Sequence, residues 1–92
     1  MSPASRPRLA ARARLRDDHP SGGTLLLWPE RGLALSPTAA DVAQLCTGTL
    51  TVAEIAARLA ARYDDAAIER VERDVLAFLH ALEERGLVVE AG

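Results

Sequence analysis

The few side chains that could carry out chemistry are spread too widely along the chain to predict a reactive site. A thiol nucleophile needs a histidine partner and an electropositive setting, but the single cysteine, Cys46, lies far in sequence from both His19 and His80. The same three residues are too few for a closed zinc site, which needs four ligands. The adjacent carboxylates Asp17 and Asp18 would point to opposite faces of a strand, so we expect them to be solvated. We therefore predict no catalytic residue, no metal site and no bound cofactor, and we interpret Cys46 as a buried structural residue.

Length and composition point to one small domain that is not an enzyme. The chain has 92 residues, of which 49% are hydrophobic but only 3% aromatic, so its core must be built from Leu, Val, Ile and Ala. The phosphate-binding, nucleophile-elbow and zinc-protease motifs are all missing from the sequence. No apolar run approaches the ~20 residues of a membrane span, and the N-terminal arginines interrupt any secretory signal. We expect a cytoplasmic protein with no membrane partner.

The net charge of −2 hides an uneven distribution of charge along the chain. Residues 1–16 contain five arginines and no acidic residue, whereas the remainder contains six arginines and thirteen acidic residues. Residues 1–8 also contain two prolines and two serines, which is typical of a flexible segment. We predict a flexible basic arm over residues 1–8 and a single domain over residues 9–92.

The first third of that domain has the alternation and the turn residues of short strands. Residues 9–17 alternate loosely and permit one strand, and the Gly- and Pro-containing stretch over residues 19–23 predicts a loop. The apolar run over residues 24–28 predicts a buried strand, and residues 29–32 predict a tight turn into a second strand over residues 32–35. These strands would form a two- or three-stranded antiparallel sheet.

After residue 35 the hydrophobic period changes to that of helices. Ser36 and Pro37 predict the start of a helix over residues 37–47 that Gly48 would close. The segment from Thr51 to Glu54 forms a capping box for a second helix over residues 52–63. A third helix is expected over residues 65–85, capped by Asp64 or Asp65 and ended by Gly86, and residues 87–90 could add a last strand. The predicted fold class is α+β, a winged-helix-like domain with an N-terminal sheet followed by a three-helix bundle.

Two functions from different classes fit this order of elements. The short link over residues 47–51 resembles a helix-turn-helix connection, so a winged-helix DNA-binding protein is one alternative. Residues 64–86 oppose it, because they contain three arginines against seven acidic residues and therefore offer no basic face to phosphates. The second alternative is a docking module, in which an extended peptide adds a strand to the sheet edge beside an amphipathic helix.

An ordered set of segments decides between these alternatives by resemblance. The set comprises residues 14–18 (RLRDD), 25–31 (LLLWPER), 35–39 (LSPTA), 45–48 (LCTG), 51–55 (TVAEI) and 74–79 (DVLAFL), followed by Leu82, Gly86 and Leu87. Over roughly residues 14–88 the chain thereby resembles the PqqD family of pyrroloquinoline quinone (PQQ) biosynthesis. Two positions depart from the family pattern, because Ser36 and Thr47 stand where the family commonly has Asn and Asp. Serine caps a helix as well as asparagine does, whereas the second change removes a carboxylate from that turn.

The resemblance implies a non-catalytic peptide chaperone. Such a protein binds the precursor peptide PqqA and presents it to the radical S-adenosylmethionine (SAM) enzyme PqqE, which cross-links a Glu and a Tyr of that peptide. The peptide is expected to lie between the third strand and the third helix of the domain. Transferred to this sequence, the expected peptide-binding residues are Gly32, Leu33, Ala34, Leu35, Ile68, Val71, Val75 and Phe78. We expect no nucleic-acid partner, and the exposed strand edge leaves both a monomer and a strand-mediated homodimer open.

Overall fold

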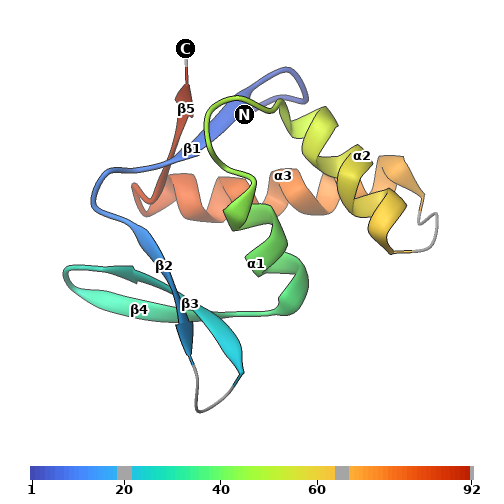
Figure 1. Ribbon diagram of the computed structural model, residues 1–92. Helices are drawn as coiled ribbons and strands as arrows, with labels where there is room; N and C mark the ends of the chain where they lie inside the picture. The colour runs from blue at the N-terminus through green and yellow to red at the C-terminus, as the bar shows by residue number, and fades with distance from the viewer. Residues whose placement is uncertain (19–21, 64–66, 92) are drawn as a thin grey trace.

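The computed structural model describes residues 1–18, 22–63 and 67–91 and has the expected α+β fold. Four strands precede three helices, and a fifth strand follows them (Figure 1). The strands are β1 (Arg6–Leu9), β2 (Arg14–Asp18), β3 (Gly23–Trp28), β4 (Arg31–Leu35) and β5 (Val88–Ala91), and the helices are α1 (Pro37–Gln44), α2 (Val52–Arg62) and α3 (Ile68–Glu84). The strands make two separate sheets, one of three strands in the order β2-β3-β4 and one of two strands, β1 and β5.

The three-stranded antiparallel sheet packs one of its faces on the helices. Its central strand β3 places Leu26 in the core with no exposed surface, between Leu15 of β2 and Leu33 of β4. Both of these neighbours pack against the core from the same face of the sheet. Strand β4 pairs with β3 as the predicted hairpin, but the turn has only two residues, Pro29 and Glu30, and is shorter than the turn predicted over residues 29–32.

The N-terminal segment differs from its prediction. Within the flexible basic arm predicted for residues 1–8, Arg6 begins strand β1, which pairs antiparallel with β5 at the other end of the chain (Figure 1). The side chains of Ser5 and Pro7 are buried, and the Ser5 hydroxyl donates a hydrogen bond to Glu90 Oε1 at 2.8 Å. The single strand expected over residues 9–17 is also wrong, because a turn at Ala11 separates β1 from β2. The partner strand that orders this segment lies at the far end of the sequence, where no local pattern can reveal it.

Helix α1 ends at Gln44, three residues earlier than predicted. The residues of its predicted last turn form hydrogen bonds with β1 instead. The Leu9 N–H donates to the Cys46 carbonyl at 3.2 Å, and the Gly48 N–H donates to the Pro7 carbonyl at 2.9 Å. Gly48 has the positive φ (87°) expected of a helix-closing glycine, but it lies beyond the helix and against the β1–β5 sheet. The prediction that Gly48 closes α1 is therefore wrong.

The starts of α1 and α2 follow the sequence signals. The Ser36 hydroxyl accepts a hydrogen bond from the Ala39 N–H at 3.2 Å, with Pro37 as the first helical residue. The Thr51 hydroxyl accepts from the Glu54 N–H at 3.1 Å, and Glu54 Oε1 accepts from the Thr51 N–H at 2.8 Å, which completes the capping box.

The third helix begins three residues later than predicted and ends one residue earlier. It starts at Ile68, after Ala67, which makes no side-chain cap. The predicted caps, Asp64 and Asp65, lie outside the described residues. The helix ends at Glu84, and Gly86 follows with a φ of 70°, the conformation that favours glycine after a helix.

The core joins both sheets to the three helices. Its largest fully buried side chains come from β3, α2, α3, β5 and the turn before β5; they are Leu26, Val52, Ile55, Leu59, Leu79, Leu82, Leu87 and Val88. As predicted, this core is aliphatic. The three-stranded sheet lies beside α1, and β4 leads directly into that helix (Figure 1).

Candidate functional site

Strand β4 is an edge strand with an accessible backbone. Trp28 and Arg31 flank the two-residue turn and pair with each other, so in the antiparallel alternation they form the hydrogen-bonded pair that closes the hairpin. The backbone groups of Leu33 then point toward β3, and those of Gly32 and Ala34 point away from it to the free edge. Both Gly32 and Ala34 are exposed. The edge therefore offers main-chain donors and acceptors to an added strand.

The side chains of β4 divide between the two faces of the sheet. Leu33 and Leu35 are half-buried and pack against the core, whereas Gly32 and Ala34 lie on the opposite face. Of the four β4 residues predicted to bind a peptide, two can thus offer backbone groups at the free edge, and two support the strand from beneath.

The four predicted residues of α3 share one stripe of the helix but differ in exposure. Ile68 stands at the first position of the helix with 41% of its surface exposed. Val71 and Phe78 are half-buried, and Val75 is 3% exposed. Val75 can therefore form the floor of a binding groove, while Phe78 is accessible at its side.

A groove of about 230 Å³ lies between α3 and the beginning of α1. It is lined by Ser36, Thr38, Ala39, Val42, Asp74, Val75 and Phe78. Its lining thus joins two of the predicted α3 residues, Val75 and Phe78, to the segment that directly follows β4. The groove is not lined by Ile68, Val71 or the β4 residues. The predicted site therefore has two parts, the free edge of β4 and the groove that follows it.

Sequence reasoning missed the α1 side of this groove. Thr38 and Val42 are four residues apart and therefore share one helical face, which is the signal that could have placed them there. From the sequence, Ser36 is expected only as a helix cap and Val42 only as part of the helix over residues 37–47. Asp74, which is exposed, adds a carboxylate to the rim.

A hydrogen bond between α1 and α2 holds the α1 wall in place. The Tyr63 hydroxyl donates to Asp41 Oδ2 at 2.6 Å, and Arg62 forms an ion pair with Asp41 Oδ1 at 3.0 Å. The bond to the carboxylate raises the pKa of Tyr63, because it stabilises the protonated phenol. Asp41 thereby anchors the middle of α1 to the end of α2.

The reactive side chains do not form a catalytic arrangement in the part of the chain that the structure describes. Cys46 is 4% exposed, and its thiol donates to the Val42 carbonyl at 3.2 Å. Burial raises the pKa of Cys46 to about 12, so the thiol stays protonated at neutral pH, unlike a nucleophilic thiolate. His80 is exposed and lies 3.1 Å from Glu84, and His19 is outside the described residues. Among the described residues, no three His, Cys, Asp or Glu side chains are grouped as metal ligands would be.

Within residues 1–18, 22–63 and 67–91, none of the helices has both the length and the apolar character needed to cross a bilayer. What the described site offers is an open strand edge and an adjoining groove with apolar side chains, a combination suited to an extended polypeptide.

Comparison with known proteins shows which family the chain matches. Residues 23–88 match the model of a family described as coenzyme PQQ synthesis protein D (PqqD). The chain is 40% identical over 91 residues to the PqqA binding protein of Bradyrhizobium diazoefficiens, an alignment that covers 99% of this chain and 87% of that protein.

Two solved structures share the fold over almost the whole chain. The solution structure of the PqqD truncation of Methylobacterium extorquens PqqCD, described as a functional and stand-alone recognition element for ribosomally synthesised and post-translationally modified peptides, is 34% identical with a TM-score of 0.78. The match covers 97% of this chain and 99% of that one. Lasso peptide synthetase B1, solved in complex with its leader peptide, has the same fold with a TM-score of 0.78 at 24% identity, covering 92% of this chain and 99% of that one.

Proposed function

The chain belongs to the PqqD family, and from this membership we propose that it binds the PqqA precursor peptide and presents it to the radical SAM enzyme PqqE during PQQ biosynthesis. The relatives named PqqA binding protein and the recognition element from Methylobacterium extorquens support the peptide-binding part of this proposal. The chain acts as a non-catalytic adaptor. A buried, protonated Cys46 and an exposed His80 support that role.

In the proposed binding mode, the peptide adds a strand to the free edge of β4. The observation that carries this mode is the outward backbone of Gly32 and Ala34 at a strand edge that leads, through Leu35, into the groove against α3. Main-chain hydrogen bonds at the edge supply affinity, and apolar contacts with Val75 and Phe78 supply selectivity.

DNA binding, the alternative function, fits the charges of α3 poorly. The helix carries Arg70 and Arg73 against five carboxylates, those of Glu69, Glu72, Asp74, Glu83 and Glu84. Phosphate neutralisation supplies most non-specific DNA affinity, and this helix would repel phosphates instead. Absence of duplex binding at low salt would eliminate this alternative.

Strand-mediated pairing of two copies would compete with the peptide for one edge. A second β4 added to the first would occupy the same outward backbone groups of Gly32 and Ala34. We therefore propose that such a homodimer and the peptide complex exclude each other. Light scattering with and without PqqA tests this.

The test of the proposed mode replaces Ala34 by proline. Proline removes the outward N–H at position 34 and leaves the pairing of Leu33 with β3 intact. We expect Ala34→Pro to remain folded by circular dichroism and to weaken PqqA binding at least tenfold by calorimetry. Ala34→Ser is the matched control, because it changes the side chain and keeps the N–H; it should bind as the parent does. A folded Ala34→Pro variant with unchanged affinity would show that the peptide does not use this edge.

A further inference from the structure

The side of the three-stranded sheet that faces away from the helices carries two leucines. Because successive side chains on a strand alternate between faces, Leu25 and Leu27 lie opposite the buried Leu26. Leu15 and Leu33 pack against the core from the face of Leu26, whereas Leu25 and Leu27 are not among the side chains packed against it. Both are half-buried. An apolar strip, separate from the core cluster, therefore runs along the middle of the outer face.

Two arginines border this strip along β2. Arg14 pairs in register with Leu27, and Arg16 pairs with Leu25, so each guanidinium group extends from the same face as the leucine beside it. Both arginines are exposed, and neither takes part in an ion pair with any other described residue. Arg12 differs, because it bonds to the Arg85 carbonyl at 2.6 Å and lies 3.4 Å from Glu30.

The opposite border of the strip, along β4, carries only small residues. Gly32 pairs with Leu27, and a Cβ at Gly32 would come within 2.7 Å of Leu27 Cδ2, so the leucine lies across the glycine. Ala34 pairs with Leu25 and is the only other β4 side chain on this face. The outer face therefore has an apolar centre, two cations on one side and small residues on the other.

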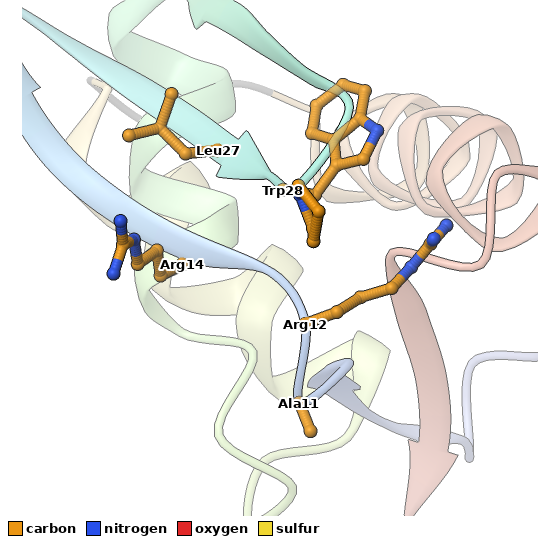
Figure 2. Close-up of a pocket in the computed structure, with 6 residues that line it drawn as sticks. Ala11, Arg12, Arg14, Leu27 and Trp28 are labelled. Carbon is orange, nitrogen blue, oxygen red and sulfur yellow. The ribbon is translucent and has the colours of Figure 1, made fainter.

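A hollow of about 470 Å³ opens at one end of this face, beside the β3–β4 turn. Its lining consists of Ala11, Arg12, Arg14, Leu27, Trp28 and Pro29. Figure 2 shows Arg14 on β2 beside Leu27 on β3, whereas Arg12 extends in another direction, toward the end of α3. Arg14 is thus the cation of the hollow that is left for a ligand, and Leu27 forms part of its apolar wall.

We propose that this outer face is a second docking surface, to which the peptide-processing enzyme binds through a patch where carboxylates surround an apolar centre. The inference rests on the proposed adaptor function, since an adaptor must hold a peptide and an enzyme at once. A strand added to β4 extends the sheet sideways and leaves Leu25, Leu27 and the two arginines open. The acidic character of the partner follows from charge complementarity, because exposed cations border the strip in a protein whose net charge is −2.

The test compares two double variants with the same change in charge. The outer-face variant combines Arg14→Glu with Arg16→Glu. The control variant combines Arg6→Glu with Arg58→Glu, which reverse two charges at exposed positions of β1 and α2, away from the outer face. Each folded variant and the parent are titrated with PqqE and, separately, with PqqA. We expect the outer-face variant to lose at least tenfold in PqqE affinity and to keep its PqqA affinity, while the control keeps both. The parent's PqqE affinity should fall with added salt more steeply than that of the outer-face variant.

Each other outcome identifies what fails. If the outer-face variant and the control bind PqqE equally, the docking surface is elsewhere and the inference is overturned, while the proposed function stands. If the outer-face variant also loses PqqA, the face is part of the peptide site and the inference is overturned. If the parent is a dimer by light scattering and the outer-face variant is a monomer, a second copy occupies the face instead. Failure of the parent to bind PqqE overturns both this inference and peptide presentation, whereas failure to bind PqqA overturns the proposed peptide binding itself.

Discussion

The Tyr63 hydroxyl donates a 2.6 Å hydrogen bond to Asp41, across the boundary between the end of α2 and the middle of α1. Asp41 also forms an ion pair with Arg62, so one carboxylate on α1 joins it to α2 twice. The wall of the candidate groove depends on this connection, because Thr38 and Val42 of the groove lie on the same short helix as Asp41.

Loss of this hydrogen bond should loosen α1. Tyr63→Phe keeps the ring and removes the donor, so we expect a lower urea midpoint and faster amide exchange in α1. The parent's stability should also depend on pH. Because the pKa of Tyr63 is raised in the folded state, its contribution is complete below the ordinary tyrosine pKa and is lost as the pH rises through the folded value. Urea melts of both proteins from neutral to alkaline pH should therefore converge, and parallel curves would contradict this role.

Peptide binding should depend more on Phe78 than on Ile68. Phe78 lines the groove, whereas Ile68 is 41% exposed at the start of α3 and outside the groove lining. We expect Phe78→Ala to weaken PqqA binding about tenfold or more and Ile68→Ala to weaken it at most a few-fold, as measured by calorimetry. Ile68→Ala should change the unfolding free energy by no more than about 0.5 kcal/mol, the usual effect at an exposed site. A larger loss of affinity for Ile68→Ala would move the peptide toward the first turn of α3.

Gly48 should tolerate a side chain poorly because of its neighbours as well as its backbone. A Cβ there would lie 3.2 Å from that of Ala91 and 3.6 Å from that of Arg8, at a φ of 87°. We expect Gly48→Ala to lower the unfolding free energy by more than the ~1–2 kcal/mol of the left-handed conformation alone. Gly22→Ala is the matched control, since Gly22 has a φ of 72° with nothing within 4 Å of a new Cβ. Equal losses in denaturant melts would mean that the loop and the β1–β5 sheet separate easily.

The Cys46 thiol should be unreactive until the protein unfolds. Burial raises its pKa from 9.0 to about 12, so at pH 8 a thiol reagent should react with the native protein only through opening. Between about pH 9 and 12 the unfolded state loses the proton first, so stability should decline over that range. Cys46→Ala should cost roughly 1–2 kcal/mol through the cavity it leaves, and should leave PqqA binding intact. Rapid labelling in native buffer would contradict the buried structural role.

Local signals predicted much of the fold. The Ser36 cap, the capping box from Thr51 to Glu54 and the glycine after α3 depend on hydrogen bonds and dihedral angles within a few residues, so the sequence contains them in full. The hairpin from Gly23 to Leu35 is equally local, since a two-residue turn sets its register.

Only the tertiary structure decided the contacts between distant segments. Arg6 pairs with Ala91, so the N-terminal segment that reads as a basic arm is a strand, and the same strand takes the hydrogen bonds that would have lengthened α1. The peptide-site residues stay a prediction, but their surroundings depend on the fold, because α1 closes the groove against Val75 and Phe78. The hydrophobic period of a segment determines which of its apolar side chains share one face. Which other segment covers that face depends on long-range pairing and packing, and the sequence of either segment alone does not show it.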